Sequence, residues 1–209
     1  NPIGLTAYVS DLILMEERSE KDKASIQMIK EASQQALTLT NELLGFTQES
    51  EEKLSETTAL ESIMEKAVKQ HQFKAAEKGQ FIQIENSEPD LLVTGNPEKL
   101  NRVVNNLLDN AIKFSPLQGK IFVGLQKEGN QALLTVADQG IGIPEDKRTN
   151  VFDRFTAARR QGTSGEKSFG LGLSICREII EEQGGTIELQ STEKQGTVFY
   201  IRLPLAKNA

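Results

Sequence analysis

The apolar residues at the start of the chain recur at alternating steps of three and four, which is the spacing of one helix face. In residues 1–52 this pattern predicts two helices joined near Glu17–Lys21, and in the second helix it forms an unbroken heptad seam. The first stripe contains Leu5, Tyr8, Leu12 and Met15, and the second contains Ile29, Ala32, Ala36, Leu39, Leu43 and Phe46. The chain therefore begins with an expected antiparallel helical hairpin.

A hairpin of this kind buries only part of its apolar stripe. Pairing with a second copy into a four-helix bundle would cover the remainder, so we expect a homodimer through the hairpin. The alternative is a monomer in which the hairpin packs on the chain's own second domain. The polar run Thr47–Lys53 follows the second helix, and we place the domain boundary there, with domains at residues 1–52 and 53–209.

Helical periodicity returns between Thr57 and Lys78, and Gly79 is placed to end that helix as the residue after its C-cap. The apolar positions of this stretch are Leu60, Ile63, Met64, Ala67, Val68, Phe73 and Ala76. His71, the only histidine of the chain, lies in the same helix. Because the sequence shows no cysteine, histidine or carboxylate constellation around it, we expect His71 to face solvent or to pack.

Strand-like runs occupy much of the second domain. They lie at Phe81–Glu85, in "DLLVTG", and at residues 120–127, 133–138, 186–190 and 196–203. Together with about three helices, these runs predict a two-layer α/β sandwich. The fold class expected for the whole chain is α+β, with the helical hairpin followed by this sandwich.

Two glycine-containing segments flank a polar stretch in the second half of the chain. In the first, Asp138 follows the apolar run "LLTV", and Gly140 and Gly142 allow a sharp turn and keep side chains out of the way of a ligand. In the second, Gly170 and Gly172 precede an apolar-periodic helix, so free backbone N–H groups and a positive dipole end would face a phosphate. Taken together, the segments indicate a nucleotide pocket.

A third element strengthens this interpretation. The stretch "NRVVNNLLDNAIKFSP" (residues 101–116) has a helical period with one broad apolar face. Asn106, Asn110 and Lys113 are spaced i, i+4, i+7 and share one side of that helix. Two amides and an amine on one side can meet a metal ion and its phosphates.

Composition narrows the class of function. The formal net charge of −6 argues against a nucleic-acid-binding surface and against anionic membrane, since both are met by basic faces. The single cysteine, Cys176, falls in an apolar-periodic helix and is expected to be a buried hydrophobe, which fits a reducing compartment. The sequence shows no signal peptide and no apolar run long enough to span a membrane. We expect a cytoplasmic location, and a membrane sensor domain, if one belongs to this protein, would lie upstream.

Four motifs in order now resemble a known family. "NNLLDNAIKFSP", "DQGIGIP", "VFDRF" and "FGLGLSI" are similar to the N box, first glycine box, F box and second glycine box of sensor histidine kinases, within residues 96–203. These kinases share their ATPase domain with gyrase B, Hsp90 and MutL. The resemblance implies that residues 1–52 form a dimerisation and phosphotransfer hairpin and that residues 53–209 form a catalytic domain binding ATP and Mg²⁺.

The resemblance also assigns roles to residues. Asp138 would accept a hydrogen bond from the adenine amine, Asn110 would ligate Mg²⁺ with Asn106 nearby, Lys113 would reach a phosphate, and Phe114 would lie against the nucleotide. Asn106 and Lys113 are the expected catalytic residues. The remaining residues expected to contact ATP are Gly140, Gly142, Ile143, Phe155, Gly170, Leu171, Gly172 and Leu173.

The stretch between the F box and the second glycine box is small, polar and glycine-bearing, so we expect Thr156–Ser168 to cover the phosphates. Arg159, Arg160 and Lys167 are each expected either to reach the triphosphate or to belong to a solvated loop without a direct role. Phe152 and Phe155 are expected to be core residues that anchor the base of this cover.

One position in the N box distinguishes the kinase branch of the superfamily from the gyrase-type ATPases. Gyrase-type ATPases carry a glutamate that activates water, whereas Asn106 at the matching position is an amide and cannot act as a base. Direct hydrolysis is therefore disfavoured. Phosphoryl transfer to a positioned acceptor remains, with catalysis by orientation and charge neutralisation.

The resemblance also leads us to expect the acceptor histidine upstream of this sequence. "NPIGL" at Asn1 resembles the tail of the motif that carries the phosphorylated histidine, which would stand four residues before Asn1. His71 is not assigned that role. Asn1 would match the residue that positions water for dephosphorylating the partner response regulator, and a terminus without a role is the alternative.

Two other functions remain to be weighed against the kinase. A nucleotide-responsive pseudokinase scaffold would share every motif but lack the acceptor histidine, so the residues just upstream discriminate between the two. A serine/threonine kinase of the same superfamily is disfavoured, because such anti-sigma-type relatives lack the heptad hairpin.

Overall fold

The computed structural model describes residues 26, 29, 33, 56–89, 91–153, 162–165 and 171–206. The chain divides into two units, Asn1–Ser50 and Glu51–Ala209. In the first unit only Ile26, Ile29 and Ser33 are described, and all are helical. The predicted hairpin, its bundle and its dimer interface otherwise lie outside the described residues, so those predictions remain predictions.

The second unit contains a five-stranded mixed sheet with the strand order β2-β4-β5-β7-β6. Its strands are β2 (Phe81–Ser87), β4 (Lys120–Glu128), β5 (Gln131–Asp138), β6 (Thr186–Thr192) and β7 (Gly196–Pro204). Strand β2 pairs with β4 in parallel, and the other three pairings are antiparallel. A separate antiparallel pair joins β1 (Thr57–Ala59) to β3 (Leu92–Thr94).

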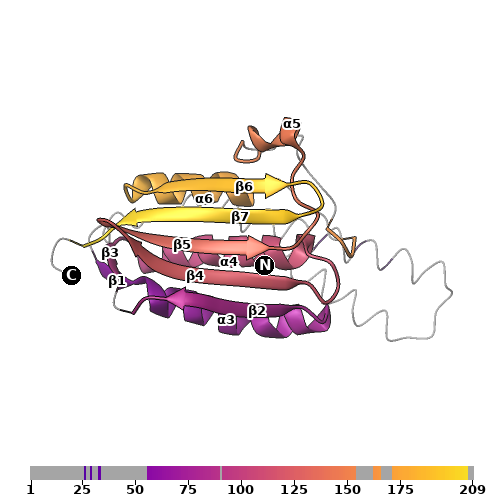
Figure 1. The fold of residues 1–209 in the computed structure, drawn as a ribbon, viewed down its shortest axis with the longest axis horizontal. Coiled ribbons are helices and arrows are strands. Elements are labelled where there is room, and N and C mark those ends of the chain that lie inside the picture. Colours follow the sequence, from indigo (N-terminus) through magenta and orange to yellow (C-terminus); the bar gives the residue numbers. More distant parts are fainter. Residues whose placement is uncertain are drawn as a thin grey trace. The chain divides into compact units, whose positions relative to one another are not determined.

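Helices cover one face of this sheet. In Figure 1, α3 (Leu60–Glu77), α4 (Pro97–Phe114) and α6 (Gly172–Glu182) all lie behind the strands, and the short α5 (Glu145–Arg148) lies apart near the end of β6. This arrangement confirms the predicted two-layer α/β sandwich. The two layers are held by apolar side chains that are almost fully buried: Met64, Leu107, Leu108, Ile112, Ile121, Leu125, Leu134, Ile180, Ile201 and Leu203.

The start of the first helix in this unit differs from the sequence prediction. Residues Thr57–Ala59, predicted as helical, form β1 instead, with Thr57 opposite Thr94 and Ala59 opposite Leu92. The backbone of this segment pairs with a strand far along the chain, an interaction that apolar periodicity does not encode. At the other end, Gly79 has φ of 64°, as expected for the residue that ends the helix.

The buried stripe of α3 also follows a different path from the predicted one. Phe73 is 77% exposed and Ala76 is exposed, whereas His71 and Ala75 are buried. His71 and Ala75 continue the spacing of Met64, Ala67 and Val68, so the stripe runs straight along the helix through a histidine. His71 therefore packs, which is one of the roles expected for it.

The prediction that no carboxylate lies near His71 is wrong. Its Nδ1 lies 2.9 Å from the carbonyl oxygen of Ala67, and its Nε2 lies 3.4 Å from Asp109 Oδ1 on α4. Lys74 is bonded to the same carboxylate. The hydrogen bond with Asp109 raises the pKa of His71 above its ordinary value, although burial acts in the opposite direction. Asp109 was missed because it reaches His71 only through the packing of α3 on α4.

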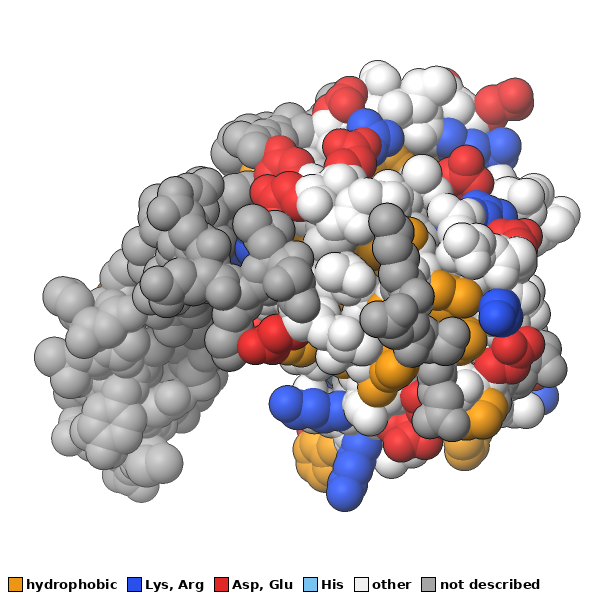
Figure 2. All heavy atoms as spheres, turned by 90° about the vertical axis from the view of Figure 1, so that its left-hand side faces the viewer, with side chains coloured by type: hydrophobic (Ala, Val, Ile, Leu, Met, Phe, Trp, Pro, Cys, Tyr) orange, Lys and Arg blue, Asp and Glu red, His pale blue; other side chains and the backbone are white. Residues whose placement is uncertain are grey.

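The surface is mixed in charge. Figure 2 shows acidic and basic side chains interspersed over the face in view. No helix among the described residues is both long enough and apolar enough to cross a membrane.

Candidate functional site

Helix α4 carries the polar row of the N box. Asn96 caps its first turn, because its Oδ1 accepts hydrogen bonds from the N–H groups of Glu98 and Lys99 at 2.9 and 3.0 Å. The apolar face of the helix is buried against the sheet through Val103, Val104, Leu107, Leu108, Ala111 and Ile112. Asn106, Asn110 and Lys113 are only half-buried. The helix therefore offers this polar row beside its buried face, as the spacing predicted.

The second glycine segment lies next to this row. A Cβ built on Gly172 at the start of α6 would lie 3.8 Å from Asn106 Cγ, so the two motifs face each other. The Asn106 amide also points its Nδ2 at Cys176 Sγ, 3.7 Å away on α6. Leu171, the N-cap residue, is buried and makes no side-chain cap, so the first-turn N–H groups of α6 have no partner from that side chain.

Cys176 is the buried residue that the sequence predicted. Burial raises the pKa of its thiol to about 12, so it stays protonated at neutral pH. Leu173, one residue into α6, is half-buried.

Asp138 ends strand β5 on the helix-covered face of the sheet. It follows the buried Leu134 and Val136 at steps of two, and its Cα partners in the neighbouring strands are the buried Ile121 and Thr197. Its Oδ1 accepts a hydrogen bond from Gly140 N–H at 2.8 Å. Burial raises the pKa of the carboxyl to about 6, while the backbone N–H groups of Gly140 and Thr197 lower it in part. The end of β5 thus presents a partly desolvated hydrogen-bond acceptor.

The first glycine segment is fixed by close packing on the protein's own backbone. A Cβ on Gly140 would lie 2.4 Å from the carbonyl oxygen of Phe114, and one on Gly142 would lie 1.9 Å from that of Thr192. Gly142 has φ of 60°, as a sharp turn requires. The requirement for glycine at these two positions therefore comes from close packing on the protein's own backbone, and the expectation that they also keep side chains away from a ligand stays a prediction.

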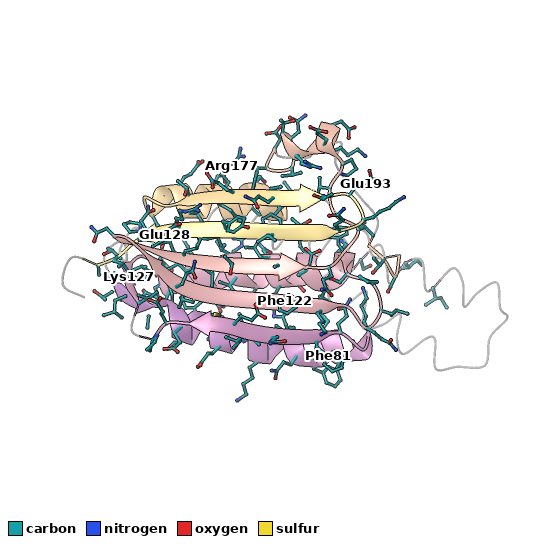
Figure 3. The ribbon with its side chains drawn as sticks, viewed as in Figure 1. Phe81, Phe122, Lys127, Glu128, Arg177 and Glu193 are labelled. Carbon is teal, nitrogen blue, oxygen red and sulfur yellow. The ribbon has the colours of Figure 1, made fainter. Side chains whose placement is uncertain are left out.

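The residues between and after these glycines fasten the loop to both sides. Ile141 N–H donates to Phe114 O at 3.1 Å, and Lys194 N–H donates to Ile141 O at 2.8 Å. Ile143 N–H donates to Ser191 Oγ at 2.8 Å. The loop therefore joins the end of α4 to the β6–β7 turn. Figure 3 shows which end of the sheet this is, because Glu193 of that turn lies at the opposite end from Lys127 and Glu128 of β4.

The C-terminal end of α4 brings Lys113 and Phe114 to the same place. The Lys113 ammonium lies 5.5 Å from the centroid of the Phe114 ring, and both side chains are half-buried. Gly162–Gly165, the described part of the predicted cover, is bonded to this end of the helix, because Thr163 N–H donates to Lys113 O at 3.0 Å. Phe152 is buried, as predicted, and the Arg177 guanidinium lies 4.3 Å from its ring centroid.

Sequence reasoning missed several residues at this end of the sheet. Thr197 is buried opposite Asp138, and its hydroxyl lies 2.9 Å from that of Ser191, which also donates to Gly196 O. Thr163 and Lys78 bond to the end of α4. None of these stands in a recognisable motif, and only the strand register or the helix packing reveals them. Asn1, Phe155, Arg159, Arg160, Lys167 and Gly170 lie outside the described residues.

The donor set suits a nucleotide with a lightly ligated metal ion. A desolvated carboxylate can accept from an amine, Gly172 leaves room beside Asn106, and the start of α6 offers N–H groups. Within the described residues there is no group of three or more His, Cys, Asp or Glu side chains that could hold a metal ion by themselves. Such a set fits Mg²⁺ held by one amide and by phosphate oxygens, since Mg²⁺ takes few protein ligands beside phosphate.

Comparison with known proteins agrees with this geometry. Residues 95–207 match the family model described as histidine kinase-, DNA gyrase B-, and HSP90-like ATPase. The circadian input-output histidine kinase CikA of Synechococcus elongatus is 30% identical over 89% of this chain, and the chain spans 25% of the length of CikA. The solved structure of the mycobacterial sensor histidine kinase MprB is similar with a TM-score of 0.63 and 28% identity, covering 72% of this chain and 97% of that one.

A further structure extends the similarity in fold over nearly the whole chain. It is that of the histidine kinase ThkA in complex with the response regulator protein TrrA, with a TM-score of 0.71 and 24% identity. It covers 98% of this chain and 59% of that one.

Proposed function

Because this chain belongs to the histidine kinase-, DNA gyrase B- and HSP90-like ATPase family, with sensor histidine kinases among its relatives, we propose that it is the ATP-binding core of a sensor histidine kinase. It would bind Mg²⁺-ATP and transfer the γ-phosphoryl group to a histidine, from which the group passes to an aspartate of a response regulator. The observation that carries this proposal is Asp138, a half-buried carboxylate at the end of a strand, just before the first glycine segment.

Each end of the nucleotide would meet a different element. Asp138 would accept from the adenine amine, and Gly140 N–H would keep its carboxylate in place. Ile143 and Phe114 would border the base and sugar. Leu171, Gly172 and Leu173 would present the start of α6 to the phosphates, where helix N–H groups stabilise negative charge.

The N box would handle the metal ion and the transferred group. Asn110 would ligate Mg²⁺ through its amide oxygen, and the ion would neutralise charge on the phosphates. Lys113 would add a point charge near a phosphate. Asn106 would orient the phosphates beside Gly172, and its amide cannot take a proton from water, so transfer to an acceptor is favoured over hydrolysis.

The described residues contain no suitable phosphoryl acceptor. His71 is 9% exposed, and both ring nitrogens face partners, Ala67 O and Asp109. We therefore place the acceptor histidine upstream of Asn1, at the start of the hairpin, which would dimerise through its heptad seam. A response regulator is the proposed partner, as the complex of ThkA with TrrA suggests, and the cytoplasm is the proposed location.

The test is calorimetric titration with ATP and GTP, with and without Mg²⁺, on this chain and on Asp138→Ala and Asp138→Asn. We expect Mg²⁺-dependent binding of ATP in preference to GTP, and Asp138→Ala should weaken it about 10- to 100-fold. Asp138→Asn keeps an acceptor oxygen and should retain more affinity. If the folded wild-type chain binds neither nucleotide, the proposal fails and a scaffold without catalysis takes its place.

A further inference from the structure

The carbonyl groups at the C-terminal end of α4 are satisfied by three separate parts of the chain. Phe114 O accepts from Ile141 in the first glycine segment at 3.1 Å, and Ile112 O accepts from Lys78 Nζ at 2.8 Å, just after α3. Lys113 O accepts from Thr163 N–H at 3.0 Å. Because the last carbonyls of a helix have no partner within the helix, these contacts decide how its end is held.

Thr163 uses both its backbone N–H and its hydroxyl in this contact. Its N–H donates to Lys113 O, and its hydroxyl donates to Ser115 O at 2.6 Å. The same hydroxyl accepts from Lys78 Nζ at 2.9 Å. A hydroxyl has one hydrogen to donate and two lone pairs, so this arrangement matches its capacity.

Lys78 links the end of α3 to the same point. Its ammonium lies at the negative end of the α4 dipole, where a cation is stabilised, and it contacts both the helix carbonyl of Ile112 and Thr163 Oγ1. Lys78 and Thr163 are 85 residues apart in the sequence, so no local preference explains their contact.

We propose that Lys78 and Thr163 are positioning residues that anchor residues 162–165, between the F box and the second glycine box, to the end of the helix carrying Asn110 and Lys113. This anchor sets the affinity for the phosphate end of the nucleotide. The proposal rests on the proposed function for its ligand, while the anchor itself is a property of the protein without nucleotide.

The physical reason is the entropy of ordering a long connection. Thr163 divides the chain between Asp153 and Leu171 into two shorter connections, and closing a shorter connection costs less conformational entropy. The attachment points are the carbonyl of Lys113, the residue proposed to reach a phosphate, and the carbonyl of Ser115, which accepts from the Thr163 hydroxyl. Removing the anchor should therefore weaken contacts with phosphates and leave contacts with adenine unchanged.

The first experiment compares MgATP with adenosine in Thr163→Val and Thr163→Ser. Valine has the shape of threonine without the hydroxyl, and serine keeps the hydroxyl. We expect Thr163→Val to weaken MgATP binding about three- to tenfold with adenosine binding unchanged, and Thr163→Ser to restore most of the affinity. A general distortion of the site would weaken the binding of MgATP and of adenosine to the same extent, and that outcome would overturn the proposal.

The second experiment needs no nucleotide. Arg159, Arg160 and Lys167 place trypsin sites on both sides of Thr163. Cleavage at these bonds, followed by mass spectrometry on the folded chain, should be several-fold faster in Thr163→Val and in Lys78→Met, and the double variant should add little to either. Lys74→Met is the matched control, because Lys74 lies in the last turn of α3 and is bonded to Asp109. This variant should be cleaved at the same rate as the wild type.

The two experiments separate the two proposals. If wild-type chain binds no ATP but the variants show faster cleavage, the anchor stands and the proposed function fails. If cleavage is unchanged in Thr163→Val and Lys78→Met, the anchor is refuted whatever the nucleotide affinity.

Discussion

Asp138 and Thr197 lie directly opposite each other on β5 and β7, and both face the helical layer. The backbone N–H of Thr197 and that of Gly140 both support the carboxylate, yet burial still leaves its pKa raised to about 6. The pairing of β5 with β7 thus offsets part of the effect of burial on the pKa of the residue proposed to recognise adenine.

The first prediction concerns pH. An ionised carboxylate accepts a stronger hydrogen bond than a protonated carboxyl, so affinity for adenosine should fall about three- to tenfold between pH 7.5 and pH 5. Adenosine is the ligand of choice because it lacks phosphates that titrate in the same range. Asp138→Asn should bind with little pH dependence, and an equally pH-dependent variant would assign the titration to another group.

The same pKa has a consequence for stability without ligand. The folded value lies above the ordinary value of 3.8, so the contribution of Asp138 to stability is fully present below about pH 4 and is lost as the pH rises through about 6. The nucleotide-free Asp138→Asn variant should gain in stability relative to wild type at pH 7.5 and should gain less at pH 4.5. Urea unfolding at the two pH values measures this difference.

A matched glycine pair gives the second prediction. Gly142 has a positive φ, and an added Cβ would lie 1.9 Å from Thr192 O, whereas the nearest atom to a Cβ on Gly172 is 3.8 Å away. Gly142→Ala should lower the free energy of unfolding by roughly 2 kcal/mol or more, because backbone must move. Gly172→Ala should change it by less than about 1 kcal/mol. Urea denaturation compares the two, and equal losses would contradict this account.

Gln80 gives the third prediction. Its side chain is 3% exposed, and its Nε2 donates to Ile112 O, Ser115 O and Pro116 O at 3.0–3.1 Å. Gln80→Leu should cost about 1–3 kcal/mol of unfolding free energy, since those bonds are lost while each carbonyl keeps another donor. Gln80→Glu has the same shape but cannot donate when ionised, so it should cost more than Gln80→Leu at pH 8. The reverse order of the two variants in thermal or urea unfolding would show that donation from Nε2 to these carbonyls does not stabilise the fold.

Some features of the fold and of the candidate site could be predicted from the sequence, and others could not. Asp138 at a strand end and the row of Asn106, Asn110 and Lys113 on one helix side follow from local periodicity, and the structure has them in those places. The sandwich follows from the order of strands and helices. Thr197 opposite Asp138 and Thr163 on Lys113 depend on pairings between distant segments, which local pattern does not specify. The start of α3 was mistaken for the same reason, since β1 exists only because β3 pairs with it.

His71 and Asp109 give the last prediction. The hydrogen bond with Asp109 raises the pKa of His71, so the stabilisation from protonated His71 is fully present below about pH 6.5 and is lost as the pH rises through the higher folded value. Although burial acts to raise it, the pKa of Asp109 is lowered by His71 and Lys74, so its own contribution is present at neutral pH and lost only in acid. In wild type, unfolding free energy should therefore decline from pH 6 to pH 8.5. His71→Gln keeps a polar side chain without a titrating ring and should flatten that decline, whereas Lys74→Met should retain it because the ring still faces Asp109. Urea unfolding at several pH values tests this pair, and a decline of equal size in His71→Gln would show that another group is responsible.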